Sequence, residues 1–172
     1  MTFASKLGND YSDVRANAKF KTVSIQANDV VFELKVRIPV KRELDAMTAA
    51  ITDPGQHLID AIYESLAAPL RKTLEDAEDG FLEALNKDSE KIRLTENDII
   101  VEGNSVRQVA KMTAISQLQV EKYFSLIKSA TGEPINESYE EIADEFPESV
   151  IREILKKIDE AIKPNYAESK KN

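Results

Sequence analysis

The chain has 172 residues, of which 42% are hydrophobic and 6% aromatic, with no cysteine and no tryptophan. This composition suits one ordinary domain, or a domain with a small appendage, with a mainly aliphatic core, and it argues against a wholly disordered chain. The lack of cysteine excludes thiol catalysis and cysteine-ligated metal, and a formal net charge of −8 disfavours a nucleic-acid partner because phosphates repel an acidic surface.

The first 18 residues are polar and lack apolar periodicity, so we expect a flexible arm at 1–18. They show no secretory signal pattern. No apolar stretch in the chain approaches the roughly 20 residues of a membrane span. We therefore expect a protein of the cytoplasm that has no membrane partner.

A β-hairpin is the clearest local prediction. Residues 32–38 alternate between apolar and charged side chains, which indicates a half-buried strand that Pro39 ends. Val23 and Ile25 alternate with polar residues in the same way, and residues 27–29 suit a turn between the two strands. The apolar side chains of the second strand are Phe32, Leu34, Val36 and Ile38.

Two helical patterns follow the hairpin. Leu44, Met47 and Ile51 share one helical face, and residues 52–55 end that helix. A second, longer apolar stripe consists of Leu58, Ile62, Leu66, Leu70, Leu74, Ala77, Phe81 and Leu85. Pro69 lies inside it and predicts a kink or break near 67–68, because proline removes a backbone donor and clashes with the preceding turn.

A second short hairpin and three more helices are expected after residue 91. Apolar residues at 92–94 and 99–101 flank a turn at 95–98, and Asn104 or Ser105 suits the cap of the next helix. Helical patterns then run from 106 to about 130, over 137–145, and between Pro147 and Pro164. The last helix is predicted to bury Val150, Ile151, Ile154, Leu155, Ile158 and Ile162.

This order of elements predicts an α+β fold that is predominantly α-helical. An N-terminal β-hairpin packs with helices, and an all-helical C-terminal part follows. We place the flexible arm at 1–18, the α+β part at 19–101, the helical part at 104–163 and a disordered tail at 164–172. The link at 102–104 is too short for a free tether, so we expect the two parts to pack as one body.

The residues suggest neither an active site nor a metal site. The one histidine, His57, has no orienting partner in sequence, and we interpret it as a solvated first-turn residue. Two acidic groups lack the loop pattern of a calcium hand, and acidic helix faces are most often solvated. These groups are Asp76, Glu78 and Asp79, and Glu137, Glu140, Glu141, Asp144 and Glu145. The sequence predicts a protein that is not an enzyme, with no catalytic, cofactor-binding or metal-ligating residue and no cofactor.

Residues 105–124 have the spacing of a helix-turn-helix. Ala110 is placed where two helices would cross, Ala114 in the turn, and Ser116 at the cap of the second helix. The second helix would present a nearly neutral face, whereas a DNA reader exposes arginine, lysine or asparagine. A plain helical corner is therefore favoured, and a small DNA-binding regulator is kept as the alternative function.

Three segments resemble the tail assembly chaperones of long-tailed bacteriophages. Residues 31–44 look like the early strand of that family followed by a proline and a helix, 105–124 like its helical corner, and 140–154 like its closing helical segment. The resemblance covers most of the chain without an invariant signature. The family has no catalytic residues to carry over.

The resemblance implies a non-catalytic chaperone of tail morphogenesis. Such proteins bind the tape-measure protein and tail tube subunits in the host cytoplasm, and they are absent from the mature virion. Self-association is left open. An acidic surface with apolar helices fits this work, because a chaperone needs an apolar contact surface and enough charge to stay soluble without its partner.

Overall fold

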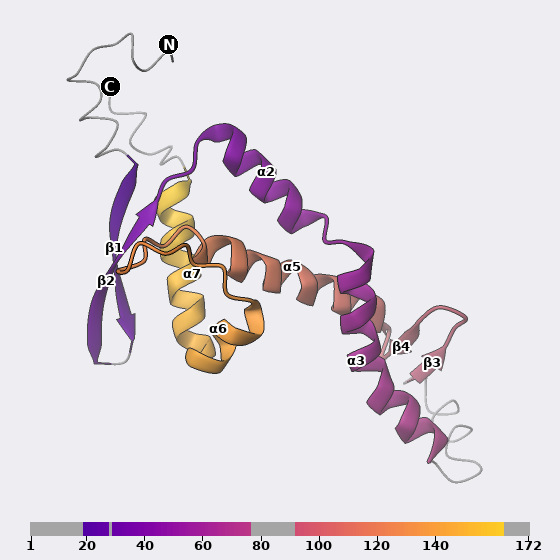
Figure 1. The fold of residues 1–172 in the computed structure, drawn as a ribbon. Coiled ribbons are helices and arrows are strands. Elements are labelled where there is room, and N and C mark those ends of the chain that lie inside the picture. Colours follow the sequence, from indigo (N-terminus) through magenta and orange to yellow (C-terminus); the bar gives the residue numbers. More distant parts are fainter. Residues whose placement is uncertain (1–18, 28, 77–91, 164–172) are drawn as a thin grey trace, which may run out of the picture. The chain divides into compact units, whose positions relative to one another are not determined.

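The computed structural model describes residues 19–27, 29–76 and 92–163 (Figure 1). Of these, 57% lie in helices and 19% in strands, which confirms the predicted α+β class. The expected arm at 1–18 and tail at 164–172 lie outside the described residues. The same holds for Asn28 in the first turn, for Ala77, Phe81 and Leu85 of the apolar stripe, and for Glu78 and Asp79.

The described elements follow one another in this order: β1 (Phe20–Ala27), β2 (Val30–Arg37), α2 (Lys41–Thr52), α3 (Gln56–Glu75), β3 (Ile92–Leu94), β4 (Ile99–Val101), β5 (Asn104–Ser105), α5 (Val106–Phe124), α6 (Tyr139–Glu145) and α7 (Glu148–Ile162). They fall into two compact units. Unit 1 comprises the described residues of 1–48 and 119–172, and unit 2 comprises those of 49–118. The predicted boundary at 102–104 is therefore not where the units separate, because the chain leaves unit 1 within α2 and returns to it within α5.

In unit 1 the predicted hairpin is confirmed. β1 and β2 pair antiparallel, with Val23 opposite Leu34 and Ile25 opposite Phe32. Since side chains alternate across a strand, this register gathers the apolar side chains on one face. Ile25 and Val36 are fully buried, and α7 packs against β1 (Figure 1).

The starting points of α6 and α7 are explained by the residues that precede each helix. α6 begins after Ser138, whose hydroxyl accepts from the Glu141 backbone N–H while the Glu141 carboxylate accepts from the Ser138 N–H. This reciprocal pair is a capping box, and it explains why the helix begins at Tyr139. α7 follows Pro147 and carries the expected apolar face, although Val150 and Leu155 are only half-buried. Its buried residues are Ile151, Ile154, Ile158, Ala161 and Ile162.

The buried face of α3 in unit 2 agrees with the predicted stripe in part, since Leu74 is buried and Leu58, Ile62 and Leu70 pack against the core. Ile59, Tyr63 and Ala67 are buried, whereas Leu66 is 37% exposed. Ile59, Tyr63 and Ala67 form one core cluster with Ile99, Val106, Ala110 and Ala114. The cluster thus combines large side chains of α3 with the small Ala110 and Ala114 of α5. Of the predicted kink or break near 67–68, the break is wrong, because α3 continues as one helix through Pro69.

The helix-turn-helix prediction is wrong as well. Residues 106–124 form one uninterrupted helix, so Ala114 lies mid-helix and fully buried, with no turn and no corner. Ser116 is an exposed residue within that helix rather than a cap. The helix also ends at Phe124 and not near 130, because the chain then extends to pair with β2 through a bridge between Val36 and Ile127. This bridge and β5 add extended structure to the part expected to be all-helical.

Candidate functional site

His57 and the two acidic groups singled out from the sequence do not come together at one site among the described residues. His57 is exposed in the first turn of α3. The acidic residues at 137–145 are exposed around α6, and Asp76 is exposed at the end of α3. Over the described ranges, no group of three or more histidine, aspartate or glutamate side chains could hold a metal ion. No helix in the described part of the chain is long and apolar enough to cross a membrane.

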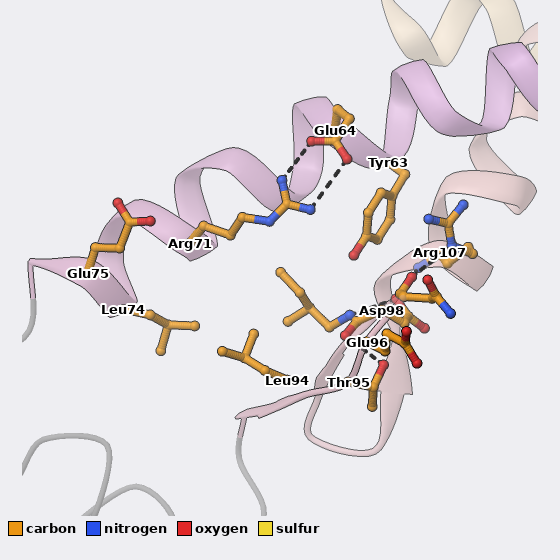
Figure 2. Close-up of a pocket in the computed structure, with 12 residues that line it drawn as sticks. Tyr63, Glu64, Arg71, Leu74, Glu75, Leu94, Thr95, Glu96, Asp98 and Arg107 are labelled. Carbon is orange, nitrogen blue, oxygen red and sulfur yellow. Dashed lines mark hydrogen bonds and ion pairs between the residues drawn. The ribbon is translucent and has the colours of Figure 1, made fainter.

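Unit 2 contains a pocket of about 590 Å³ between α3 and the β3–β4 turn (Figure 2). Tyr63 stands at its centre with an arginine on either side. The guanidinium carbon of Arg107 lies 4.2 Å from the centre of the tyrosine ring, and that of Arg71 lies 5.7 Å away. Both positions allow cation–π attraction, which helps to keep the buried ring in place.

Each of these arginines is already engaged by a carboxylate. Arg71 donates to both oxygens of Glu64, at 2.6 and 3.3 Å, and this bond is the main reason that the pKa of Glu64 is lowered. Arg107 donates to Asp60 at 2.6 Å, and the pKa of Asp60 is lowered by its bonds from Gln56 and Arg107. The described residues that line the pocket include no further cation. We therefore interpret this cluster as packing of α3 on α5 and the turn rather than as a site for an anion.

Asp98, at the edge of the same pocket, fixes the start of α5. Its Oδ1 accepts from the N–H groups of Ile99 at 2.8 Å and Arg107 at 3.0 Å, and its Oδ2 accepts from the Ser105 hydroxyl. Burial by itself raises the pKa of Asp98, but these three bonds outweigh burial and lower it. Ser105 Oγ accepts from the Gln108 N–H at 2.9 Å, which confirms Ser105 as the predicted cap.

Unit 1 contains a more apolar groove of about 640 Å³ between β2 and the segment that leads through α6 to α7. Apolar side chains from distant parts of the chain meet along it. They include Phe32 and Leu34 of β2, Phe124 and Ile127, and Ile142 and Phe146. The rings of Phe124 and Phe146 pack edge to face, with their centres 6.0 Å apart.

Charged side chains border this groove. Glu33, Glu137, Glu141 and Glu145 line it together with Lys35 and Lys128. The ammonium of Lys128 lies over the Phe20 ring, 5.2 Å from its centre, and is thus partly engaged. Carboxylates outnumber ammonium groups, so the border is acidic. An apolar floor with a charged border is typical of a surface that binds another polypeptide.

Comparison of the chain with protein-family models, curated protein sequences and solved structures finds no match. Function is therefore inferred from the residues of the chain itself.

Reasoning from the sequence did not find the groove. Phe32 and Leu34 were expected on the buried face of a strand, and both are only half-buried because the groove leaves one side open. The signal that could have pointed to it is the concentration of large apolar residues in segments that are not helical, such as 126–127 and Phe146.

Proposed function

We propose that this chain is a non-catalytic tail assembly chaperone of a long-tailed bacteriophage. It would bind the tape-measure protein and tail tube subunits in the host cytoplasm during tail morphogenesis and leave before the virion is complete. The observation that carries the proposal is the groove of unit 1. Two of the three segments that resemble the family, 31–44 and 140–154, both contribute residues to its lining.

The groove has the properties that temporary protein binding requires. A partner that covers its apolar floor gains about 25 cal/mol for each Å² of apolar surface removed from water. The groove is open to solvent, so one contact of this kind is weak and reversible. Many weak contacts along one long partner would hold it firmly and still allow release, because the effective concentration of neighbouring sites is high.

The third resembling segment, 105–124, supports the proposal less. It supplies Phe124 to the groove, but the expected helical corner is replaced by a straight helix. The same straight helix takes away the support for a DNA-binding regulator, since a recognition helix needs a turn before it. We therefore favour protein binding over duplex binding.

Co-expression tests this proposal. The chain is produced with the tape-measure protein encoded in the same gene cluster, and the soluble fraction and the co-purified complex are measured. We expect the chain to raise the soluble yield of its partner. Phe32→Ser should reduce that yield, while Ser24→Asp, an exposed position on β1, should leave it unchanged. A tape measure that stays equally insoluble with and without the chain, together with no binding of tube subunits, would refute the proposal.

A further inference from the structure

One edge of the hairpin is only partly covered. Beyond β2, the segment at 126–128 pairs with the strand around Val36. The Arg37 N–H donates to the Leu126 carbonyl at 2.8 Å, and the Lys128 N–H donates to the Lys35 carbonyl at 2.8 Å. The pairing reaches no further along β2 toward the turn of the hairpin.

This pattern determines where the other backbone groups of β2 point. Backbone groups of a strand alternate between its two edges, so those at 31 and 33 point to the same edge as those of Arg37. The even-numbered residues point to β1, in agreement with the bond of 2.7 Å from the Ile38 N–H to the Lys19 carbonyl. Among the described residues, no group bonds to the N–H or C=O of Val31 or Glu33.

Beyond Lys128 the described segment makes a local turn and forms no further backbone hydrogen bond with β2. After Lys128, the Thr131 N–H donates to Ser129 Oγ at 3.1 Å, and Gly132 has a φ of +83°, which favours glycine. No described residue of the chain therefore pairs with Val31 and Glu33 on this edge. This edge lies against the groove, since residues 32–35 form one of the groove walls. Val31 itself is 63% exposed.

We propose that the groove binds an extended apolar and basic peptide segment, which adds to β2 as a strand at Val31 and Glu33. This inference rests on the proposed function and names the form in which the partner is held. A helix uses its own N–H and C=O groups internally, so only an extended segment can bond to both residues. Side chains opposite Phe32 then point to the apolar floor, and the alternate side chains lie on the other face of the sheet, beside Glu33.

The charge of the border selects the occupant. Glu137 and Glu145 line the groove, and Glu33 lies on the face of β2 opposite to Phe32, none of them with an ion pair among the described residues, whereas Lys128 already lies over Phe20. Lysine or arginine beside the apolar residues of the partner would therefore be favoured. An acidic segment would be repelled.

Fluorescence anisotropy of the full chain tests the mode of binding. The probe is a labelled peptide of seven residues in which valine and lysine alternate, and the comparison is the same peptide with glutamate in place of lysine. Val31→Pro removes an outward N–H that the hairpin does not use. Gln26→Pro is the matched control, because Gln26 lies opposite Val31 in the register and its N–H points to the other edge.

We expect the lysine peptide to bind, and Val31→Pro to weaken it by about fivefold, the effect of one lost hydrogen bond. Gln26→Pro should leave the affinity within about twofold of the unchanged chain, a difference well below that of one hydrogen bond. Equal effects of the two substitutions, or equal affinity for the glutamate peptide, would overturn the inference.

Amide hydrogen exchange on the unsubstituted chain gives a second readout that no folding defect can disturb. The N–H groups of Val31 and Glu33 should exchange fast in the free chain and slow down when the lysine peptide binds. Slow exchange in the free chain would mean that a segment of this chain or a second copy already covers this edge of β2, and the inference would be wrong. If the chain keeps the tape measure soluble and Val31→Pro does not change this, strand addition is refuted while the proposed chaperone function stands. If the peptide adds to β2 but the chain has no effect on the tape measure, the chaperone function is refuted while strand addition stands.

Discussion

The hydroxyl of Tyr123 donates a hydrogen bond of 2.9 Å to the carboxylate of Asp159, which joins α5 to α7 within unit 1. Burial, followed by this bond to a negatively charged partner, raises the pKa of Tyr123 to about 12. The folded state thus favours the neutral phenol. The stability that results is complete below the ordinary tyrosine pKa of about 10, and it is lost as the pH rises through about 12.

Replacement of Tyr123 by phenylalanine should therefore change the response to alkali. At neutral pH, Tyr123→Phe should lower the free energy of unfolding by about 1–2 kcal/mol, because a bond to a charged group is lost. Between pH 10 and 12 the variant should lose less stability than the unchanged chain. Urea unfolding followed by circular dichroism at pH 7, 10 and 11 measures both effects. Parallel losses of stability in the two proteins would contradict the assigned pKa.

The start of α5 should depend on a single carboxylate. Asp98→Ala removes the acceptor of two backbone N–H groups and of the Ser105 hydroxyl, and should cost about 2 kcal/mol. Glu96→Ala, an exposed change in the same turn, should be nearly neutral. Because the pKa of Asp98 is lowered, its contribution is present above the ordinary aspartate pKa and is lost as the pH falls through the folded-state value. Unfolding midpoints of both variants at pH 7 and pH 3 test this.

The sequence predicted the parts of the fold that depend on neighbouring residues. The period of two in β2 and the apolar face of α7 are local patterns, and both were confirmed. The buried face of α3 was predicted only in part, because helical spacing led to Leu74, which is buried, but also to Leu66, which is exposed, and it missed the buried Ala67. In β2, the alternation of apolar and charged residues cannot distinguish a packed side chain from one that lines an open groove.

The groove could not be predicted for a different reason. Phe32, Phe124 and Phe146 are far apart in the chain, and only tertiary packing brings them to one surface. The free edge of β2 also depends on where the segment at 126–128 stops pairing, and no residue pattern marks that point. Sequence reasoning had assigned this segment to a helix.

The proline inside α3 should destabilise unit 2. Pro69 lacks the N–H that would bond to the Ser65 carbonyl, and an interior proline is about 3 kcal/mol less favourable than alanine. Pro69 is exposed, so Pro69→Ala disturbs no core contact. We expect a higher melting temperature, with a gain of about 1–2 kcal/mol after the added freedom of the unfolded chain is subtracted. A lower melting temperature would mean that packing of α3 requires the local geometry that proline imposes.

Ala114 distinguishes a continuous helix from a helix-turn-helix. Glycine is favoured in a turn, so Ala114→Gly would be neutral or stabilising if the two helices of that motif were present. In the middle of α5 the same change should cost about 1 kcal/mol through loss of helix propensity alone. The fully buried position adds the loss of a packed methyl group, of about 0.8 kcal/mol.

Met112→Ala, on the exposed face of the same helix, serves as the control and should change the free energy of unfolding by less than about 0.5 kcal/mol. Urea unfolding of the unchanged chain and the two variants measures the difference. An Ala114→Gly variant as stable as the unchanged chain would contradict a continuous helix and support a turn at this position.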